Sequence, residues 1–468
     1  MIRAVEDCTL SVSLLRHPRA SRRAIAGFRD ARLRALVQHA YRSVPYYRQL
    51  FDAHGVDPRA IRTATDLAHL PRTAKRDLHT RPVADVVGAG ANPASLVTRM
   101  TGGSTGEPLV VRRSRREERL LSVVRRRVSR YYGYGPRDLV VVISAPRHGD
   151  AAPARGWVAS ISRRLGLLQT RHVSCLGPVE QIAERLRQLR PAVLGGYPSV
   201  LARVGEAVTA SGGFAVRPRV VITGGEVRTP AMRDRIAAAF DAPVYDTYAS
   251  HEFNRIANEC RETGAYHVSD DTVLLEVLDE DGQPVAEGER GEVVATALLS
   301  RTMPFIRYRL GDIVVKGTET CACGAPFSTI RAIEGRVVDY FALPDGRLLH
   351  PYELVAATVR AYLAVVPEAS RGERPFPWLA EYRYVQEYRD HIRVHLVARA
   401  TPPPVQLEAM ERSLRDVLGP AVRLDLVFER EMQADANGKF RVYRSLVQER
   451  SETGRMPLPP GGVRVAAG

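Results

Sequence analysis

The chain has 468 residues, of which 45% are hydrophobic and 26% are charged, and its formal net charge is +16 at pH 7. This length exceeds what one hydrophobic core usually serves, so two or more domains are expected. No run of eighteen apolar residues occurs and the acidic start lacks a secretory-signal pattern, so we expect a cytoplasmic protein without a membrane partner. The five cysteines are too few for a disulfide framework in a chain of this size.

The basic residues do not predict a nucleic-acid partner, although a charge of +16 would suit one. They are spread along the chain in helical stretches with acids between them, as on solvated helix faces, and no nucleic-acid-binding motif accompanies them. Lysine occurs only at positions 75, 316 and 439, so 65 of the 68 basic residues are arginine. Each lysine is therefore a candidate for a position where a compact ammonium group matters.

The first hundred residues contain helical patterns. Apolar residues three and four apart predict a helix between residues 20 and 50, which ends at a Pro-Tyr-Tyr turn. Residues 66–78 predict a turn and a short helix with Thr73 as its N-cap.

Residues 101–108, TGGSTGEP, form a glycine-rich segment between predicted strands at 94–100 and 109–114. Backbone N–H groups exposed in such a loop can point at one anion, so the segment is a candidate phosphate cradle. It lacks a lysine and does not match the P-loop pattern. A cation for chemistry on that phosphate must therefore come from elsewhere in the chain.

Helices and strands alternate after this hairpin, which predicts parallel α/β organisation. Loops at 195–199, 223–227 and 247–252 follow predicted strands and would converge on one crevice, the usual ligand site of such sheets. The predicted helices are 117–134, 179–189, 199–212 and 230–240, and the predicted strands are 138–146, 191–198, 219–226 and 242–249.

Strands predominate from about residue 265, and a second domain is expected after a crossing segment at 335–346. The last eighteen residues are rich in Pro, Gly and basic residues and are expected to form a disordered tail. The predicted strands are 266–271, 272–285, 288–298, 304–315, 391–400 and 423–430, and the predicted helices are 353–365 and 407–419.

Seven short motifs occur in an order and spacing that resemble the phenylacetate–coenzyme A ligase family of adenylate-forming enzymes. The resemblance extends over roughly residues 30–445. The motifs are TGGSTGEP at 101–108, GGYPS at 195–199, TGGE at 223–226, YASHE at 248–252, RYRLGD at 307–312, GR at 335–336 with Asp339 after it, and NGKF at 437–440.

This resemblance implies the adenylate-forming α/β fold, with a large N-terminal adenylation domain over 1–335, a small mobile α+β C-terminal domain over 336–450 and a tail over 451–468. It also implies an AMP-forming acid–thiol ligase that uses ATP and Mg²⁺. A carboxylate, by analogy an aryl or arylacetic acid, would attack the α-phosphate of ATP. Coenzyme A would then displace AMP from the acyl-adenylate.

The resemblance also assigns the residues that bind ATP. Hydroxyl groups and glycine backbone in the first motif would contact the phosphates, and Tyr248 and the TGGE loop would border the adenine. Asp312 would accept hydrogen bonds from both ribose hydroxyls. The expected ATP-binding residues are Thr101, Gly102, Gly103, Ser104, Thr105, Gly106, Gly224, Gly225, Glu226, Tyr248, Asp312 and Arg336.

Two residues are expected to act on the reacting phosphate. Glu252 resembles the family's magnesium-binding glutamate. Lys439 resembles the lysine that the C-terminal domain brings to the α-phosphate, where an ammonium group offsets developing charge. The chain departs from the family pattern at Ala249, where glycine is common, and at Val338, where an acid is usual, so the hinge residue is not assigned.

The acid is expected to bind beside these motifs. The predicted pocket residues are Ser144, His148, Gly196, Tyr197, Pro198, Ala249 and Ser250. Three alternatives stay open: an adenylating enzyme whose acceptor is an amine, a carrier protein or another group, a relative that binds nucleotide without turnover, and nucleic-acid binding driven by the charge of +16. A homodimer is also left open.

Three cysteines and one histidine predict a structural metal site. Cys260, His267, Cys321 and Cys323 give the donor set of a tetrahedral Cys₃His zinc site, and His251 is the alternative fourth ligand. Buried thiols without a metal are the other interpretation of the same residues.

Overall fold

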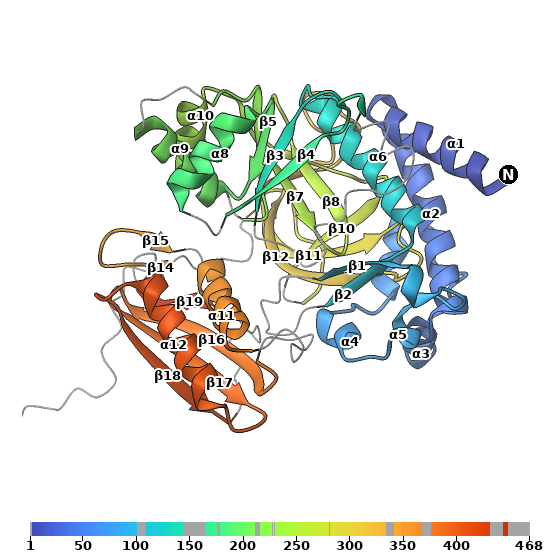
Figure 1. Cartoon of the computed structure of the whole chain (residues 1–468). Coiled ribbons are helices and arrows are strands. Elements are labelled where there is room, and N and C mark those ends of the chain that lie inside the picture. Colours follow the sequence, from blue (N-terminus) through green and yellow to red (C-terminus); the bar gives the residue numbers. More distant parts are fainter. Residues whose placement is uncertain are drawn as a thin grey trace, which may run out of the picture. The chain divides into compact units, whose positions relative to one another are not determined.

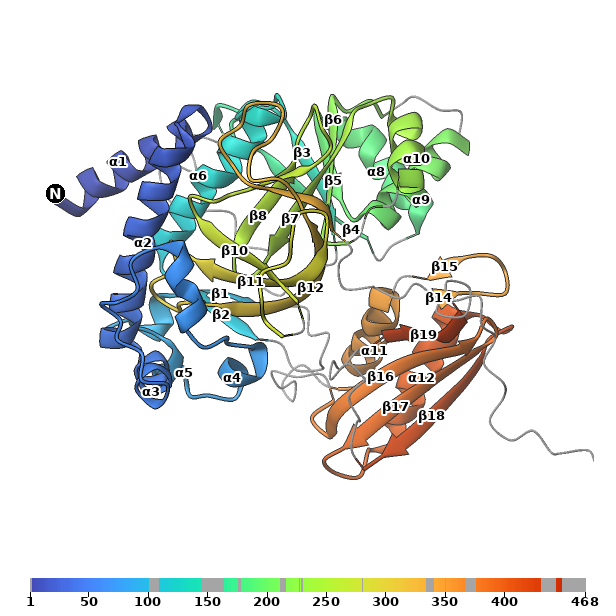
Figure 2. The ribbon, with the colours of Figure 1, turned by 180° about the vertical axis from the view of Figure 1, so that it is seen from behind.

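The computed structural model describes residues 2–100, 109–144, 164–175, 178–210, 216–226, 228, 230–279, 281–333, 341–349, 351–366, 376–430 and 443–447. They fall into two compact units, the first ending at Ile333 and the second beginning at Phe341 (Figures 1 and 2). The predicted boundary at 335–336 and the predicted tail lie outside the described residues. Among the described helices, none has the length and apolar character needed to cross a bilayer.

The first unit combines helices with one large sheet and a small hairpin. Its helices are α1 (Ile2–Arg16), η1 (His17–Arg19), α2 (Arg22–Ser43), α3 (Pro45–Ala53), η2 (Ala64–His69), α4 (Lys75–His79), α5 (Val83–Val86), η3 (Pro93–Ser95), α6 (Arg115–Tyr131), α8 (Val179–Leu189), α9 (Pro198–Ala210) and α10 (Pro230–Phe240). Its strands are β1 (Val97–Met100), β2 (Val110–Arg113), β3 (Val140–Ser144), β4 (Thr170–Ser174), β5 (Val193–Gly196), β6 (Val220–Gly224), β7 (Val244–Ser250), β8 (Asn254–Glu259), β9 (Tyr266–Val268), β10 (Val273–Leu278), β11 (Arg290–Ala297), β12 (Tyr308–Lys316) and β13 (Thr329–Ile333).

The large sheet has eleven strands in the order β10-β11-β12-β13-β9-β8-β7-β6-β5-β3-β4. Neighbouring strands from β4 to β7 are parallel, and those from β7 through β8 to β10 are antiparallel. The alternating helices and strands therefore form the predicted parallel α/β sheet. The predicted β1–β2 hairpin is also present, with Met100 paired to Val110.

Helices cover both faces of the parallel strands (Figures 1 and 2). Leu194 and Val221 pack into one core with α8, α9 and α10. Their neighbours Val193 and Val220 point to the opposite face and pack against Val128 of α6. This alternation follows from the period of two in a strand, and it explains why these strands are apolar at almost every position.

Two predictions near the N-terminal helices are wrong. The Pro-Tyr-Tyr segment is not a turn, because Pro45 begins α3: a proline at the first helical position lacks only an N–H group that has no helical partner. Thr73 does not cap α4, whose N-cap is Ala74. Thr73 is instead fully buried and pairs with Tyr308 of β12, and its hydroxyl donates to the Ile306 carbonyl at 2.9 Å.

A buried charge cluster attaches α1 to the body of the first unit. Asp271, which is 0% exposed, accepts hydrogen bonds from both terminal nitrogens of Arg127 on α6, one of them at 3.0 Å. His17 Nδ1 lies 2.7 Å from Asp271 Oδ2. Arg127 also donates to the Leu14 carbonyl of α1 at 3.0 Å. One carboxylate thus holds together two segments that are far apart in sequence.

The second unit is a four-stranded sheet with the order β18-β17-β16-β19, together with α11 and α12. Val394 and Leu396 of β17 pack with Leu354 and Leu414 of these helices into one core. The bounds are β14 (Phe341–Ala342), β15 (Leu348–Leu349), α11 (Pro351–Val365), β16 (Leu379–Tyr388), β17 (His391–Ala398), α12 (Pro404–Leu418), β18 (Arg423–Glu429) and β19 (Tyr443–Ser445).

Candidate functional site

The carboxyl ends of four parallel strands lie side by side in the first unit. Gly196 pairs with Ile143 on one side and Thr223 on the other, and Gly224 pairs with Thr247. Ser144, Gly196, Gly224 and Tyr248 therefore reach the same edge of the sheet. This edge is where open α/β sheets bind ligands.

Two glycines keep the loop after β6 close to its neighbours. A Cβ on Gly224 would lie 2.7 Å from the Thr247 carbonyl oxygen, so any larger residue would push β6 away from β7. Gly225 has a φ of +85°, and a Cβ there would lie 2.9 Å from a ring carbon of Tyr197. The predicted adenine loop and the predicted acid-binding residue Tyr197 are thus in contact through the Gly225 backbone.

Tyr248 and Asp312 are 64 positions apart in sequence but meet at this edge. The Tyr248 hydroxyl donates a hydrogen bond of 2.6 Å to Asp312 Oδ2. Tyr248 is 8% exposed and lies on β7, whereas Asp312 lies on β12. The hydrogen bond fixes one oxygen of the carboxylate, and each carboxylate oxygen can accept more than one bond.

Glu252 lies in the turn between β7 and β8 and is 6% exposed. Among the described residues its carboxylate accepts one hydrogen bond, from the Tyr308 hydroxyl at 3.4 Å. That long bond leaves most of the acceptor capacity of a buried carboxylate for another partner. Hard cations such as Mg²⁺ prefer carboxylate oxygens, so this donor suits the predicted magnesium ion.

A buried network of polar side chains connects the loop after β6 to the neighbouring strands. Asp246 accepts hydrogen bonds from Thr223 Oγ1 at 2.6 Å and Tyr266 Oη at 2.8 Å. Burial raises the pKa of Asp246, and these hydrogen bonds oppose that effect. Glu259 accepts from the Asp246 backbone N–H at 2.6 Å and pairs with Arg228 at 2.9 Å. Arg228 follows Gly225 in the chain, so the network connects the loop to β7, β8 and β9.

The predicted metal ligands come together. The sulfurs of Cys260, Cys321 and Cys323 and a ring nitrogen of His267 all lie within 4.8 Å of one another, and His251 is not part of this group. Zinc–sulfur bonds of about 2.3 Å in a tetrahedron place two sulfurs about 3.8 Å apart. The Cys260 and Cys321 sulfurs are 3.8 Å apart, and Cys323 Sγ lies 3.3 Å from His267 Nε2. These two separations are close to those expected around one tetrahedral ion.

Two of the shifted pKa values in this cluster favour metal binding and one opposes it. Burial lowers the pKa of His267, which favours the neutral imidazole that binds metals. Burial acts to raise the pKa of Cys260, but hydrogen bonds around Thr263 lower it to about 7. Burial raises the pKa of Cys323 to about 12, so a metal at this site would have to displace that proton.

Several predicted site residues lie outside the described part of the chain. They are Thr101, Gly102, Gly103, Ser104, Thr105, Gly106, His148, Arg336 and Lys439. The described members of the predicted pocket are Ser144, Gly196, Tyr197, Pro198, Ala249 and Ser250.

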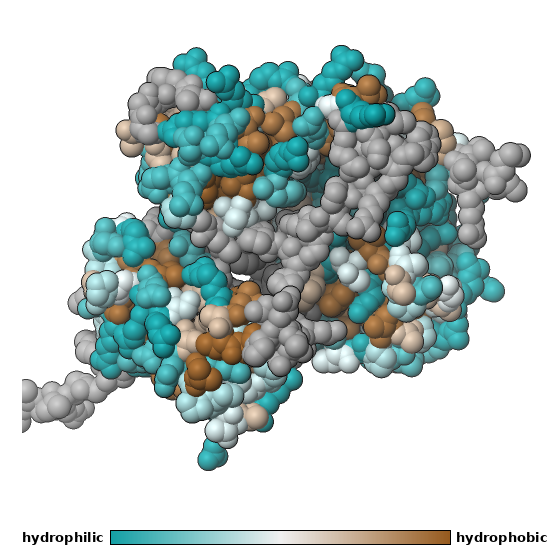
Figure 3. All heavy atoms as spheres, viewed as in Figure 1, coloured by the Kyte–Doolittle hydropathy of each residue, from teal (hydrophilic) through white to brown (hydrophobic). Residues whose placement is uncertain are grey.

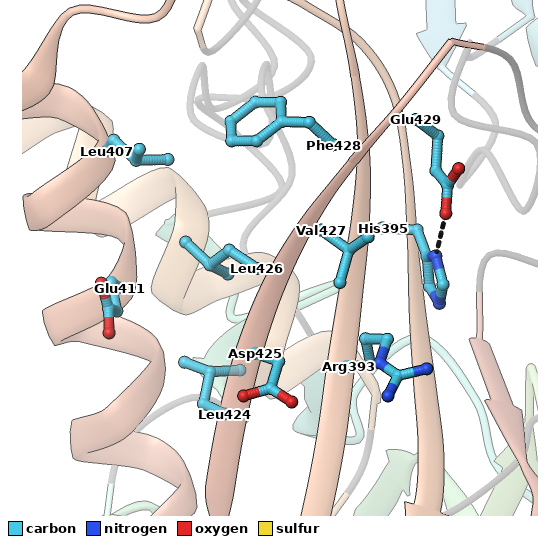
Figure 4. Close-up of a pocket in the computed structure, with 10 residues that line it drawn as sticks. All are labelled: Arg393, His395, Leu407, Glu411, Leu424, Asp425, Leu426, Val427, Phe428 and Glu429. Atoms are coloured by element: carbon cyan, nitrogen blue, oxygen red, sulfur yellow. Dashed lines mark hydrogen bonds and ion pairs between the residues drawn. The ribbon is translucent and has the colours of Figure 1, made fainter.

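A groove of about 580 Å³ lies in the second unit. None of the residues that line it is a predicted site residue. Figure 4 shows Leu407 and Glu411 on α12 facing Leu424 and Leu426 of β18. Phe428, also in its lining, is 47% exposed. Figure 3 shows apolar (brown) and polar (teal) residues mixed on the surface of this view. The groove lies along β18, which is an edge strand of this sheet among the described strands.

Arg113 is the main residue that sequence reasoning missed at the site. It is 3% exposed at the end of β2, and it donates to the Glu252 backbone carbonyl at 2.8 Å. Strand alternation offered a signal, because Leu109 and Val111 are apolar and Arg113 shares their face. Arg228 and Glu259 were also missed, and no local pattern predicts their pairing.

Four of the curated relatives that the chain matches are named phenylacetate–coenzyme A ligase. The chain is 29% identical to the phenylacetate–coenzyme A ligase of Thermus thermophilus over 75% of this chain and 77% of that enzyme. It is 32% identical to the Escherichia coli enzyme of the same name over 60% of this chain and 65% of that enzyme. For the Aromatoleum evansii enzyme of that name, the identity is 30% over 63% of this chain and 67% of that enzyme. No family model matches the chain.

Solved structures show the same fold. A 2-hydroxyisobutyryl-CoA ligase in complex with 2-HIB-AMP and CoA, in the thioesterification state, superposes with a TM-score of 0.61 at 21% sequence identity. The match covers 91% of each chain. In the postadenylation state, the ligase in complex with R3-HIB-AMP gives a TM-score of 0.57. The predicted adenylate-forming fold is therefore confirmed.

Proposed function

The chain belongs to the phenylacetate–coenzyme A ligase family, and on this premise we propose that it joins an aryl or arylacetic acid to coenzyme A at the expense of ATP. The 30% identity to the Aromatoleum evansii enzyme, over two thirds of that enzyme, is the observation that carries this conclusion. The chain is an AMP-forming acid–thiol ligase. The carboxylate displaces pyrophosphate from ATP, and the thiol of coenzyme A then displaces AMP from the acyl-adenylate.

The chain's own residues have distinct parts in this proposal. Asp312, held by the Tyr248 hydroxyl, receives the ribose hydroxyls, and the Gly224–Glu226 loop borders the adenine. Glu252 would hold Mg²⁺, which supplies charge neutralisation for the phosphates when bound. The side chains and backbone at the carboxyl edge of the sheet would align the acid with the phosphate. Such alignment contributes much of the rate in reactions of this kind.

Lys439 is proposed as the catalytic cation. It is one of three lysines in the chain and belongs to the NGKF motif. An ammonium near the α-phosphate stabilises charge that develops during adenylation. The proposal includes a mobile C-terminal domain over 336–450 that carries this lysine. A cytoplasmic location and the absence of membrane and nucleic-acid partners remain proposals, as does the homodimer left open above.

Acid-dependent ATP–pyrophosphate exchange tests this function. Native protein is expected to exchange with a subset of aryl, arylacetic and aliphatic acids, and Lys439→Ala is expected to lose about 10²-fold or more of that rate. The measurement is label incorporation into ATP in the presence of each acid. A folded, ATP-binding protein that exchanges with no acid would contradict the proposal.

The second half of the reaction is tested by the acceptor. With the best acid, native protein is expected to form an acyl thioester and AMP when coenzyme A is added. Exchange without thioester formation would favour an amine or a carrier protein as the acceptor instead.

We also propose a structural zinc ion at Cys260, His267, Cys321 and Cys323. The 3.8 Å and 3.3 Å separations of its donor atoms support it. The ion would tie the β8–β9 connection to the segment before β13. Four protein ligands leave no open coordination position, so the role is structural rather than catalytic.

Metal analysis tests the zinc site. Mildly purified native protein is expected to contain about one equivalent of zinc, and Cys321→Ser is expected to contain almost none and to melt at a lower temperature. Cys8→Ser is the matched control, because Cys8 is exposed and lies outside the cluster. Native protein with well under one equivalent would contradict the site.

A further inference from the structure

The turn that carries Glu252 is held from behind by an arginine. Arg113 Nη2 donates to the Glu252 carbonyl oxygen at 2.8 Å and also to the His251 carbonyl oxygen. These two carbonyls belong to the turn between β7 and β8. A cationic donor to consecutive carbonyls fixes the peptide planes on both sides of Glu252, and hence the direction of its side chain.

Arg113 is itself held in one orientation. Its side chain is 4% exposed, and Nη1 lies 3.2 Å from Glu118 Oε1 on α6. The same carboxylate group lies 4.0 Å from Arg99 of β1. Burial lowers the pKa of Arg113, and the Glu118 carboxylate opposes that shift. A buried guanidinium is costly unless its charge is paired. The Arg113 side chain is therefore restricted to the orientation that keeps its contact with Glu118.

Arg113 connects two parts of the proposed site that are far apart in sequence. Arg113 ends β2, and β1 and β2 flank the segment 101–108 that is expected to bind the phosphates. The residue therefore links the hairpin that carries one set of phosphate ligands to the turn that carries the expected metal ligand. Val97 pairs with Arg113 across this hairpin.

We propose that Arg113 is a positioning residue, which sets Glu252 for metal–nucleotide binding by holding the 251–252 backbone against β2. This inference rests on the proposed function of the site. Residues that orient a metal ligand typically change metal affinity or activity by about 10- to 100-fold when they are replaced. A residue that serves only stability would not change the metal affinity of the folded protein.

Metal binding provides a readout besides activity. The experiment measures Mn²⁺ affinity by electron paramagnetic resonance in the presence of a non-hydrolysable ATP analogue, and the Mg²⁺ concentration for half-maximal exchange. Arg113→Met is expected to weaken Mn²⁺ binding and raise the Mg²⁺ requirement by about 10- to 100-fold. Arg113→Lys, which keeps a cationic donor, is expected to lose less, about three- to tenfold.

Arg112→Met is the matched control. Arg112 precedes Arg113 on the same strand and points to its other face, where it donates to the Val110 carbonyl at 3.1 Å. This variant is expected to bind Mn²⁺ as native protein does.

The outcomes separate this inference from the proposed function. The positioning role would be overturned if folded Arg113→Met had a Mn²⁺ affinity and a Mg²⁺ requirement within threefold of the native values. If Arg113→Met does not fold, the same criterion applies to Arg113→Lys. Native protein that binds the metal–nucleotide pair but exchanges with no acid would contradict the proposed function and leave the Mn²⁺ comparison valid. Native protein that does not bind the pair would overturn both.

Discussion

Replacing Glu252 with glutamine is expected to lower acid-dependent ATP–pyrophosphate exchange by about 10²-fold or more, which corresponds to about 2.7 kcal/mol of transition-state stabilisation. The amide has nearly the same shape but no negative charge to bind a divalent cation. The only hydrogen bond to the carboxylate among the described residues is 3.4 Å long, so replacing Glu252 with glutamine should lower the free energy of unfolding very little. The measurement is exchange rate against Mg²⁺ concentration, with thermal melting as the check of folding.

Glu287→Gln is the control for this change. Glu287 is an exposed acid of the same unit, and its neutralisation alters the net charge by the same amount. It is expected to exchange at the native rate. If Glu252→Gln also exchanges within threefold of native protein, Glu252 does not hold the metal.

Replacing Asp271 with asparagine is expected to lower the free energy of unfolding of the first unit by about 3–5 kcal/mol. The substitution leaves the Arg127 guanidinium, whose side chain is 9% exposed, without an anionic partner. It also weakens the contact of His17 with Asp271 and so the attachment of α1. The measurement is urea unfolding followed by far-ultraviolet circular dichroism.

Two controls isolate the buried charge. In a Trp157→Phe background, fluorescence of Trp378 reports the second unit, in whose core it lies, and its transition should not move. The double variant Arg127→Met/Asp271→Asn should recover part of the loss, because no buried cation then remains unpaired. A shift below 1 kcal/mol for Asp271→Asn would contradict the argument.

The pH dependence gives this prediction a sign. Burial acts to raise the pKa of Asp271, but the charge of Arg127 and the hydrogen bonds from His17 and Arg127 together lower it below its ordinary value. A lowered carboxyl pKa stabilises the fold above the unfolded-state pKa of about 3.9, and this contribution is lost as the pH falls through the folded-state pKa. The difference between native protein and Asp271→Asn should therefore shrink below about pH 4.

Local patterns predicted most of the regular elements. The helices α8 and α12 and the strands β6 and β17 have the expected periodicities, and the structure contains them near the predicted bounds. The order of strands in the parallel part was not predicted, because β3 lies between β4 and β5 in the sheet although β4 and β5 are consecutive in the described chain. The missed strands include β4, β8, β13, β16 and β19. β8 shows one reason: it carries the buried Glu259, whose charge is balanced by Arg228 on another segment of the chain.

The sequence motifs predicted which residues form the candidate site, but not the contacts between them. The sequence suggested that Tyr248 and Asp312 would both serve the nucleotide, but not that one would donate a hydrogen bond to the other. It also grouped the four metal ligands without distances. Contacts between distant segments depend on the tertiary fold: strand alternation indicates that Arg113 is buried, but it does not predict the contact with the 251–252 backbone.

The pairing of Thr73 with β12 also has a consequence for biosynthesis. The Thr73 hydroxyl bonds to a carbonyl 233 positions later, and Tyr47 likewise donates to the distant Pro304 carbonyl. At synthesis rates of about 5–20 residues per second, the N-terminal segment waits roughly 10–50 s for these partners to emerge from the ribosome. During that time α2 and α3 expose apolar side chains such as Leu33 and Phe51, which end fully buried. The nascent first unit is thus expected to need chaperone protection until β12 has been made.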